Sequence, residues 1–250
     1  LKRIFTLFAI LLSCSSIYSQ LFVNEIDSDT DSFDELEFLE IKSESPNFSL
    51  DGYIVVFFNC STSGSDSRYL TLDLDGFQTY VTGLFLIGNN NVSPSAQLII
   101  PNSSIQNGAD AVAIYQASID DFPNSTLATT VNLIDALAYD TSDSDDDNLM
   151  LLLGLSYQIN ENENGNKTIE SIQRANDGSY FIASPTPREV NEGNGVFLNG
   201  INFSFNQESY YEGDQIEIIF TTEIPVEETI TILFNLDYEN FDSSDYSSVD

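Results

Sequence analysis

Alternating carboxylates near the N terminus are the residues whose type and spacing best suit the binding of a metal ion. Asp27, Asp29 and Asp31 form an Asp-x-Asp-x-Asp pattern, and Asp34 follows them in the same stretch. Ca²⁺ binds several hard oxygen ligands of this type. Without a cation, salt or solvent to offset them, these negative charges repel one another. The pattern therefore predicts either a calcium site or a solvated acidic loop.

The spacing does not fit an EF-hand. Counted from Asp27, Ser32 stands where the loop needs glycine, and Phe38 stands where it needs its final glutamate. A second acidic run, DTSDSDDDN at residues 140–148, contains Asp145 and Asp147. Because loops at one end of a β-sandwich can converge, the two runs could share one calcium ion. A flexible acidic loop is the alternative for either run.

Two closely spaced carboxylate pairs allow a different chemistry. Glu37 with Glu40, or Asp73 with Asp75, would supply the acid and base of a glycosidase if they flanked a sugar. Nothing in their spacing favours that role over solvated strand ends. We therefore expect no catalytic residues and no enzymatic activity in this chain.

Composition narrows the possible functions further. The 250 residues include 18 Phe and 12 Tyr, enough apolar material for a folded core, and no His. The absence of histidine excludes Ser-His-Asp and Cys-His nucleophile systems and histidine-ligated zinc. With 7 Lys and Arg against 40 Asp and Glu, the formal net charge is −33. Such a surface repels phosphate backbones, so we expect no nucleic-acid binding.

Residues 1–19 have the pattern of a signal peptide. Two basic residues precede the apolar stretch Ile4–Leu12, which is too short to span a bilayer. We expect cleavage after Ser19, so that the mature chain begins at Gln20. The alternative is a lipobox ending at Cys14, which would anchor the protein through a lipidated N terminus. Either way the sequence predicts a secreted or cell-surface protein without a transmembrane helix.

Cysteine usage predicts no disulfide framework. Once Cys14 is removed with the signal, Cys60 is the one cysteine left, and we interpret it as a half-buried thiol at a strand end. The chain has no initiator methionine and stops in mid-pattern, so we expect it to be a fragment of a longer protein.

The candidate carboxylates are positioned by short β-strands. Runs rich in β-branched and aromatic residues alternate with clusters of Gly, Pro, Asn, Asp and Ser, the pattern of a β-sandwich or barrel. Nearly continuous apolar runs at 52–59 and 83–88 predict central strands covered on both faces. The run Leu149–Leu155 fits a strand or a short helix, and a helix is also conceivable for Leu36–Ile41. The remaining strands are expected at Phe22–Ile26, Ser67–Asp73, Ala96–Ile100, Ala111–Tyr115 and Leu133–Tyr139.

Residues 196–250 are predicted to be a second unit. Strands expected at Asn202–Asn206, Gln215–Thr221 and Thr229–Leu236 alternate apolar and polar residues, so one face of each is apolar. A strand pair of this size cannot bury its apolar face alone.

Eight short motifs occur in an order that resembles a known family. They are NEI at 24–26, EFLEI at 37–41, LDGY at 50–53, GLFLIG at 83–88, GADAVAIY at 108–115, LIDALAYD at 133–140, SIQR at 171–174 and PTPREVN at 185–191. Together they resemble a lamin tail domain of the secreted bacterial kind. The resemblance implies an immunoglobulin-like β-sandwich over residues 20–195 and a non-catalytic module. One departure is Arg188, where the family pattern has glycine.

The tail resembles the start of a Calx-beta domain. Tyr211-Glu212-Gly213-Asp214 precedes one predicted strand, and Asp245-Tyr246 follows another. In that family the corresponding Glu and Asp belong to a calcium cluster, so the resemblance implies a calcium-binding role for Glu212 and Asp245. The other ligands of that cluster would come from acidic loops beyond residue 250.

The sequence thus predicts an all-β protein: an immunoglobulin-like β-sandwich followed by the first strands of a second β-sandwich. As a function we expect a secreted or cell-surface binding or adhesion module, stabilised by Ca²⁺ and facing a cell-surface protein or polysaccharide. The alternative is an accessory domain of an exported hydrolase, a nuclease or phosphoesterase, whose catalytic domain lies elsewhere.

Overall fold

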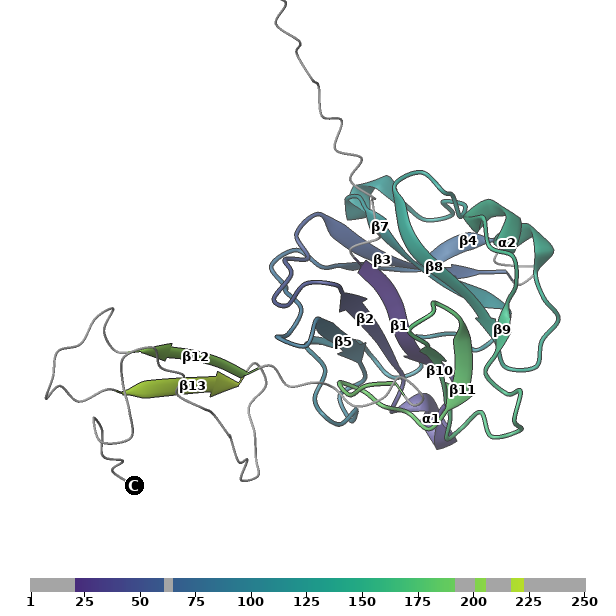
Figure 1. The fold of residues 1–250 in the computed structure, drawn as a ribbon. Helices are drawn as coiled ribbons and strands as arrows, with labels where there is room; N and C mark the ends of the chain where they lie inside the picture. The colour runs from purple at the N-terminus through teal and green to yellow at the C-terminus, as the bar shows by residue number, and fades with distance from the viewer. Residues whose placement is uncertain (1–20, 61–64, 192–200, 206–216, 223–250) are drawn as a thin grey trace, which may run out of the picture. The chain divides into compact units, whose positions relative to one another are not determined.

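The computed structural model describes residues 21–60, 65–191, 201–205 and 217–222 (Figure 1). The chain divides into two compact units, Leu1–Leu198 and Asn199–Asp250. Each is described by itself below.

The first unit contains two β-sheets. The six-stranded sheet has the order β11-β10-β1-β2-β5-β6, and all its neighbouring strands are antiparallel except β5 and β6. Its strands are β1 Leu21–Asp27, β2 Phe38–Ser43, β5 Leu84–Gly88, β6 Leu98–Ile99, β10 Ser171–Arg174 and β11 Tyr180–Ala183. The strand expected at 36–41 is therefore β2, and the helical alternative is wrong.

The second sheet has five strands in the order β4-β3-β7-β8-β9. Its strands are β3 Tyr53–Asn59, β4 Ser67–Asp73, β7 Asp110–Gln116, β8 Leu133–Asp140 and β9 Ile159–Asn160. Only β8 and β9 run parallel within it. The prediction of an all-β sandwich is confirmed, and the expected strands up to residue 139 all form.

A hydrophobic core lies between the two sheets. It joins Val23 and Ile41 of the six-stranded sheet to Val55, Phe57 and Ile114 of the five-stranded sheet, all fully buried. Because side chains alternate along a strand, the other residues of β3 point to the outer face of their sheet. That face is covered as well, so β3 is buried on both sides, as its continuous apolar run predicted.

The outer face of the five-stranded sheet is covered by helix α2, Asp147–Leu153, together with Phe122 and Ala128 of the segment after β7. The Asp146 side chain accepts a hydrogen bond from the Leu149 N–H at 2.8 Å, which caps the helix N terminus. Gly154 ends the helix in the left-handed conformation, with φ of 70°. These two signals make the leucine-rich run a helix. It packs on small side chains of the sheet: Ala111, Ala113, Ala136 and Ala138.

The described part of the first unit also contains two short helical turns. Helix α1, Asp31–Asp34, lies inside the acidic loop between β1 and β2, where the sequence predicted only a loop. The 3-10 turn η1, Ile119–Asp121, follows β7 and is closed by a capping box between Ser118 and Asp121.

The described part of the second unit is an antiparallel pair of strands, β12 Ile201–Phe205 and β13 Ile218–Thr222, with Phe203 opposite Phe220. The strand expected at Thr229–Leu236 lies outside the described residues. Among the residues that the structure describes, no helix is long and apolar enough to cross a membrane.

Candidate functional site

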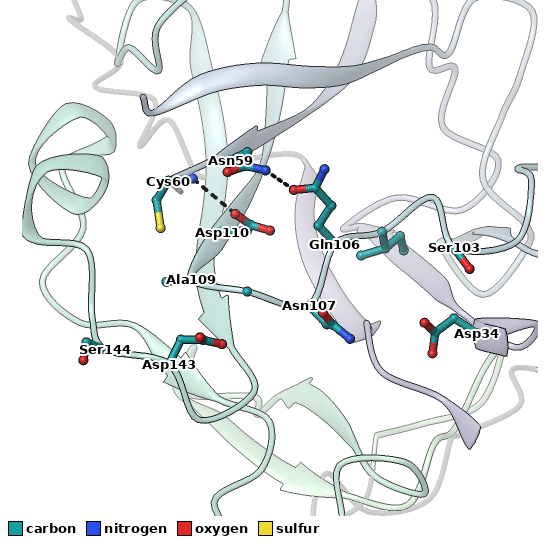
Figure 2. Close-up of a pocket in the computed structure, with 12 residues that line it drawn as sticks. Asp34, Asn59, Cys60, Ser103, Gln106, Asn107, Ala109, Asp110, Asp143 and Ser144 are labelled. Atoms are coloured by element: carbon teal, nitrogen blue, oxygen red, sulfur yellow. Dashed lines mark hydrogen bonds between the residues drawn. The ribbon is translucent and has the colours of Figure 1, made fainter. Parts of the chain in front are cut away.

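A polar pocket of about 610 Å³ opens at one end of the sandwich (Figure 2). Its lining comes from the end of α1, the end of β3, the segment of residues 103–109 that leads into β7, the start of β7 and the loop after β8. Antiparallel pairing of β3 with β7 sets Asn59 opposite Asp110 and brings both to this end. The pocket is lined by Asp34, Asn59, Cys60, Ser103, Ile105, Gln106, Asn107, Gly108, Ala109, Asp110, Asp143 and Ser144.

Asp110 is the buried acid of this pocket, with 2% of the residue exposed. Its Oδ1 accepts a hydrogen bond from the Cys60 N–H at 3.2 Å, whereas Oδ2 has no partner among the described residues. A Cβ on Gly108, which also lines the pocket, would lie 3.9 Å from Oδ2. Burial raises the pKa of Asp110 to about 6; the Cys60 N–H opposes this rise and the charge of Asp143 adds to it.

The pocket wall at Gln106 and Asn107 is fixed by hydrogen bonds. The Tyr139 hydroxyl donates to the Gln106 carbonyl at 3.0 Å, and the Thr141 hydroxyl donates to the Asn107 carbonyl at 2.6 Å. The Asn59 amide also donates to the Gln106 side chain, as Figure 2 shows. The polar atoms that face the pocket are therefore held in place by the sandwich.

The Asn107 side chain links this wall to buried acids in the loop after β1. Its amide donates to Asp29 Oδ2 at 3.2 Å, and the same oxygen forms an ion pair with Lys167. Nearby, Glu161 accepts hydrogen bonds from the Ser28 N–H at 3.0 Å and from the Ser28 hydroxyl at 2.5 Å.

Asp27, the last residue of β1, has one unsatisfied carboxylate oxygen. The residue is 4% exposed, and its Oδ1 has no hydrogen-bond partner in the described part of the chain. Burial raises the pKa of Asp27 well above its usual value, and the charge of Glu161 raises it further. Burial also raises the pKa of Glu161 to about 8, against the hydrogen bonds from Ser28. These two acids disfavour each other's ionisation.

The structure places the predicted calcium ligands in different surroundings. Asp27 and Asp29 are buried, and Asp31 is exposed at the first residue of α1. Asp145 and Asp147 are exposed next to the α2 N terminus and do not line the pocket. Glu212 and Asp245 lie outside the described residues.

The two acidic runs nevertheless meet at one place. Asp34, from the first run, and Asp143, from the second, line the same pocket. Within residues 21–60, 65–191, 201–205 and 217–222, however, no group of three or more His, Cys, Asp or Glu side chains is arranged to hold a metal ion.

The two glutamates considered as a glycosidase pair, Glu37 and Glu40, accept hydrogen bonds from two different loops. Glu37 Oε2 accepts from the Ser104 N–H at 2.9 Å, and burial raises the pKa of Glu37 to about 7. Glu40 lies on the outer face of its sheet and binds the Arg188 N–H at 2.6 Å. Neither lines the pocket. Burial raises the pKa of the Cys60 thiol to about 12, which disfavours the thiolate form that a cysteine nucleophile uses.

A second pocket, of about 670 Å³, lies beside β10 and contains Lys42 and Arg174. Arg174 pairs with Asp135 at 2.9 Å and stacks on Phe22, 4.8 Å from the ring centroid. Because Asp135 belongs to β8, this ion pair ties the two sheets together. Arg174 therefore has a structural role that accounts for its position.

The exit segment, Thr186–Asn191, is held against the six-stranded sheet by buried acids. Glu25 accepts from the Thr186 N–H at 2.7 Å, and Asn191 donates to the Asn24 carbonyl at 2.9 Å. Arg188 has a φ of 64°, the left-handed region in which glycine is unstrained. Glycine would therefore adopt this turn with less backbone strain than the arginine that occupies it.

Sequence reasoning missed Asp110 and Glu161. Asp110 directly precedes the buried run of β7 and follows the Asn107-Gly108 turn, so its place at a strand end was visible. Its burial was not, because it depends on the loops around residues 60 and 143. Glu161 lies in the polar run NENENGNKT, where nothing in the sequence distinguishes it from the half-buried and exposed residues around it.

Fold and site together define an all-β sandwich with an acid-lined pocket at one end. No family model, curated protein or solved structure matches the chain.

Proposed function

We propose that this chain is a secreted or cell-surface, non-catalytic binding module that uses the pocket at the acid-rich end of its sandwich. The observation that carries the proposal is Asp110 Oδ2, a buried acceptor without a partner in the described structure, within a preformed pocket. Buried polar atoms are nearly always satisfied, so an unsatisfied one on a residue that lines a cavity favours a bound group. The proposal includes the lamin-tail-like identity of residues 20–195 and the Calx-beta-like identity of residues 196–250.

The chemistry of the pocket supports binding over catalysis. Its described lining has carboxylates, amides and hydroxyls, and the one thiol has a raised pKa. A nucleophile with an adjacent base, which covalent catalysis requires, is not formed by these residues. If the chain belongs to an exported hydrolase instead, it would be the accessory domain that binds while another domain reacts.

Calcium is part of the proposal as a stabilising ion. Its support is the unsatisfied, buried Asp27 Oδ1 beside Glu161, where a divalent cation would offset the repulsion between two acids. Binding would require the surrounding side chains to rearrange, since the described groups do not already surround one point.

The proposed function is tested by binding and turnover on the same preparation. The exported chain is applied to arrayed polysaccharides and extracellular proteins, and is assayed with nuclease, phosphoesterase and glycosidase substrates. We expect saturable binding to at least one arrayed polymer and no turnover. Turnover of any substrate, or a complete absence of binding, would contradict the proposal.

Localisation is tested at the N terminus. Mass spectrometry of the exported protein is expected to find a chain that begins at Gln20. A lipid-modified Cys14 would instead establish anchoring to a membrane, and an intact residue 1 would contradict export through this segment.

A further inference from the structure

The pocket at the acid-rich end contains acceptors and negative charge but no basic residue. Asp34, Asp110 and Asp143 line it, and none of the described lining residues is Lys or Arg. Figure 2 shows Asp110 between the strand-end residues Asn59 and Cys60 and the segment at Gln106 and Asn107. Among the described lining residues no cation offsets the repulsion between these carboxylates and an anionic ligand.

We propose that this pocket binds an organic cation, an alkylammonium or guanidinium group, with Asp110 Oδ2 as its principal acceptor. This rests on the proposed binding function and specifies the ligand class. Ammonium and guanidinium groups carry several N–H donors and no acceptor, which complements a buried carboxylate oxygen lacking a donor. The formal net charge of −33 also attracts cations to the protein at long range.

Two other ligand classes fit less well. A divalent metal needs several oxygen ligands around one point, and the described side chains form no such group of three or more. A neutral sugar usually stacks on an aromatic ring, and the described lining contains no Phe or Tyr. An organic cation requires neither, because directional hydrogen bonds and one buried charge suffice.

The source of the cation is either a Lys or Arg side chain of a protein or a free amine. The pocket volume of about 610 Å³ accommodates both. A blocked pentapeptide with one central lysine represents the first source, and spermidine represents the second. Tighter binding of the peptide assigns the pocket to proteins, whereas tighter binding of spermidine assigns it to free amines, and either result supports the cation class.

The test measures binding of n-butylammonium chloride to the exported chain by calorimetry at low ionic strength, with n-butanol as the neutral isostere. We expect the amine to bind and the alcohol not to bind. Asp110→Asn should weaken amine binding by about tenfold or more, because a charge-assisted hydrogen bond is lost. The matched control is Asp120→Asn, the same charge change on exposed Asp120 beyond the opposite end of β7. It should change binding by less than about twofold, since Asp120 is exposed beyond the far end of β7 and water weakens its interaction with a ligand in the pocket.

A second variant keeps the test valid if Asp110→Asn does not fold. Gly108→Val places a branched apolar side chain next to Asp110 Oδ2 without changing the charge of the pocket, and a Cβ at Gly108 meets only that oxygen, at 3.9 Å. It should abolish amine binding while circular dichroism shows an intact fold. Equal binding of butanol, equal weakening by Asp120→Asn, or unchanged binding in both pocket variants would overturn the inference. If arrayed polymers still bind in that case, the proposed function stands and only the ligand class fails.

Discussion

Glu25 and Glu40 lie directly opposite each other across β1 and β2, and both are fully buried. Burial raises the pKa of Glu25 to about 6, against the hydrogen bonds it accepts. For Glu40, burial and then the charge of Glu25 raise the pKa to about 8. At neutral pH Glu40 is therefore mostly protonated. The exit segment covers both residues, through hydrogen bonds from Thr186 and Arg188.

This pair predicts that the folded chain loses stability as pH rises from about 5 to about 8.5. In that window the folded chain keeps a proton on Glu40 that the unfolded chain, with the ordinary pKa of 4.5, has lost. Glu37 and Glu161 act with the same sign, because their pKa values are also raised. Thermal melts across this range should show a falling Tm, and a rising Tm would contradict the raised values.

The variant Glu40→Gln tests the contribution of Glu40 itself. Glutamine does not titrate, so the slope of stability against pH should become shallower: the variant should lose less unfolding free energy between about pH 5 and about pH 8.5. We expect its loss to be smaller than that of the unmodified chain by at least about 1 kcal/mol. Glu189→Gln is the control, since Glu189 is exposed and should leave the slope unchanged. An unchanged slope in Glu40→Gln would mean that Glu40 titrates normally.

The exit segment is expected to depend on Asn191. Its side-chain amide donates to the carbonyls of Asn24 at 2.9 Å and Arg174 at 2.8 Å, and the residue is 2% exposed. Asn191→Ala removes both of these buried hydrogen bonds and should cost about 1–3 kcal/mol of unfolding free energy in urea. Asn164→Ala, on an exposed loop, should stay within about 0.5 kcal/mol. Equal effects would show that the exit segment adds nothing to stability.

Two glycines with nearly the same φ allow the cost of a steric clash to be measured apart from the cost of backbone strain. Gly83 has a φ of 78° and Gly165 a φ of 79°, so alanine is strained at both. A Cβ on Gly83 would lie 2.5 Å from the Ser43 carbonyl oxygen, whereas Gly165 faces open space. Gly165→Ala should cost about 1 kcal/mol, and Gly83→Ala clearly more, by chemical denaturation. Similar costs would contradict the close contact between β2 and the turn before β5.

Calcium is predicted to raise the Tm of the exported chain, because it would neutralise repulsion around Asp27. Melts in millimolar CaCl₂ and in EDTA measure this, and the difference should shrink in Asp27→Asn. Identical melting temperatures in both solutions would remove calcium from the proposal. MgCl₂ at the same concentration controls for general screening of the net charge.

The sequence predicted what depends on local pattern. Alternating and continuous apolar runs identified the strands, and β3 was recognised as central because its apolar residues leave no polar face. The run at 149–155 stayed undecided, since the outcome depended on Asp146 as a cap and on small alanines in β7 and β8. The alanines lie on other strands, and capping by Asp146 depends on a backbone geometry that the sequence pattern does not specify.

The site was harder to predict for a physical reason. Charged residues are normally exposed, so a reader of the sequence assigns Glu25, Glu40 and Glu161 to the surface. Each is buried because a remote segment supplies its hydrogen bonds: Thr186 for Glu25, Arg188 for Glu40 and Ser28 for Glu161. The two acidic runs each contribute one residue to the pocket, Asp34 and Asp143.

Hydrogen exchange can locate the binding surface and so test directly whether the protein binds through the acid-rich end of its sandwich. The exported chain is compared with and without a polymer or protein that it binds on the arrays. We predict new protection at residues 103–110 and 143–144, around Asp110, with little change at residues 174–178 beside the second pocket. Protection confined to 174–178, or spread over neither pocket, would contradict the claim that this protein binds through the acid-rich end of its sandwich.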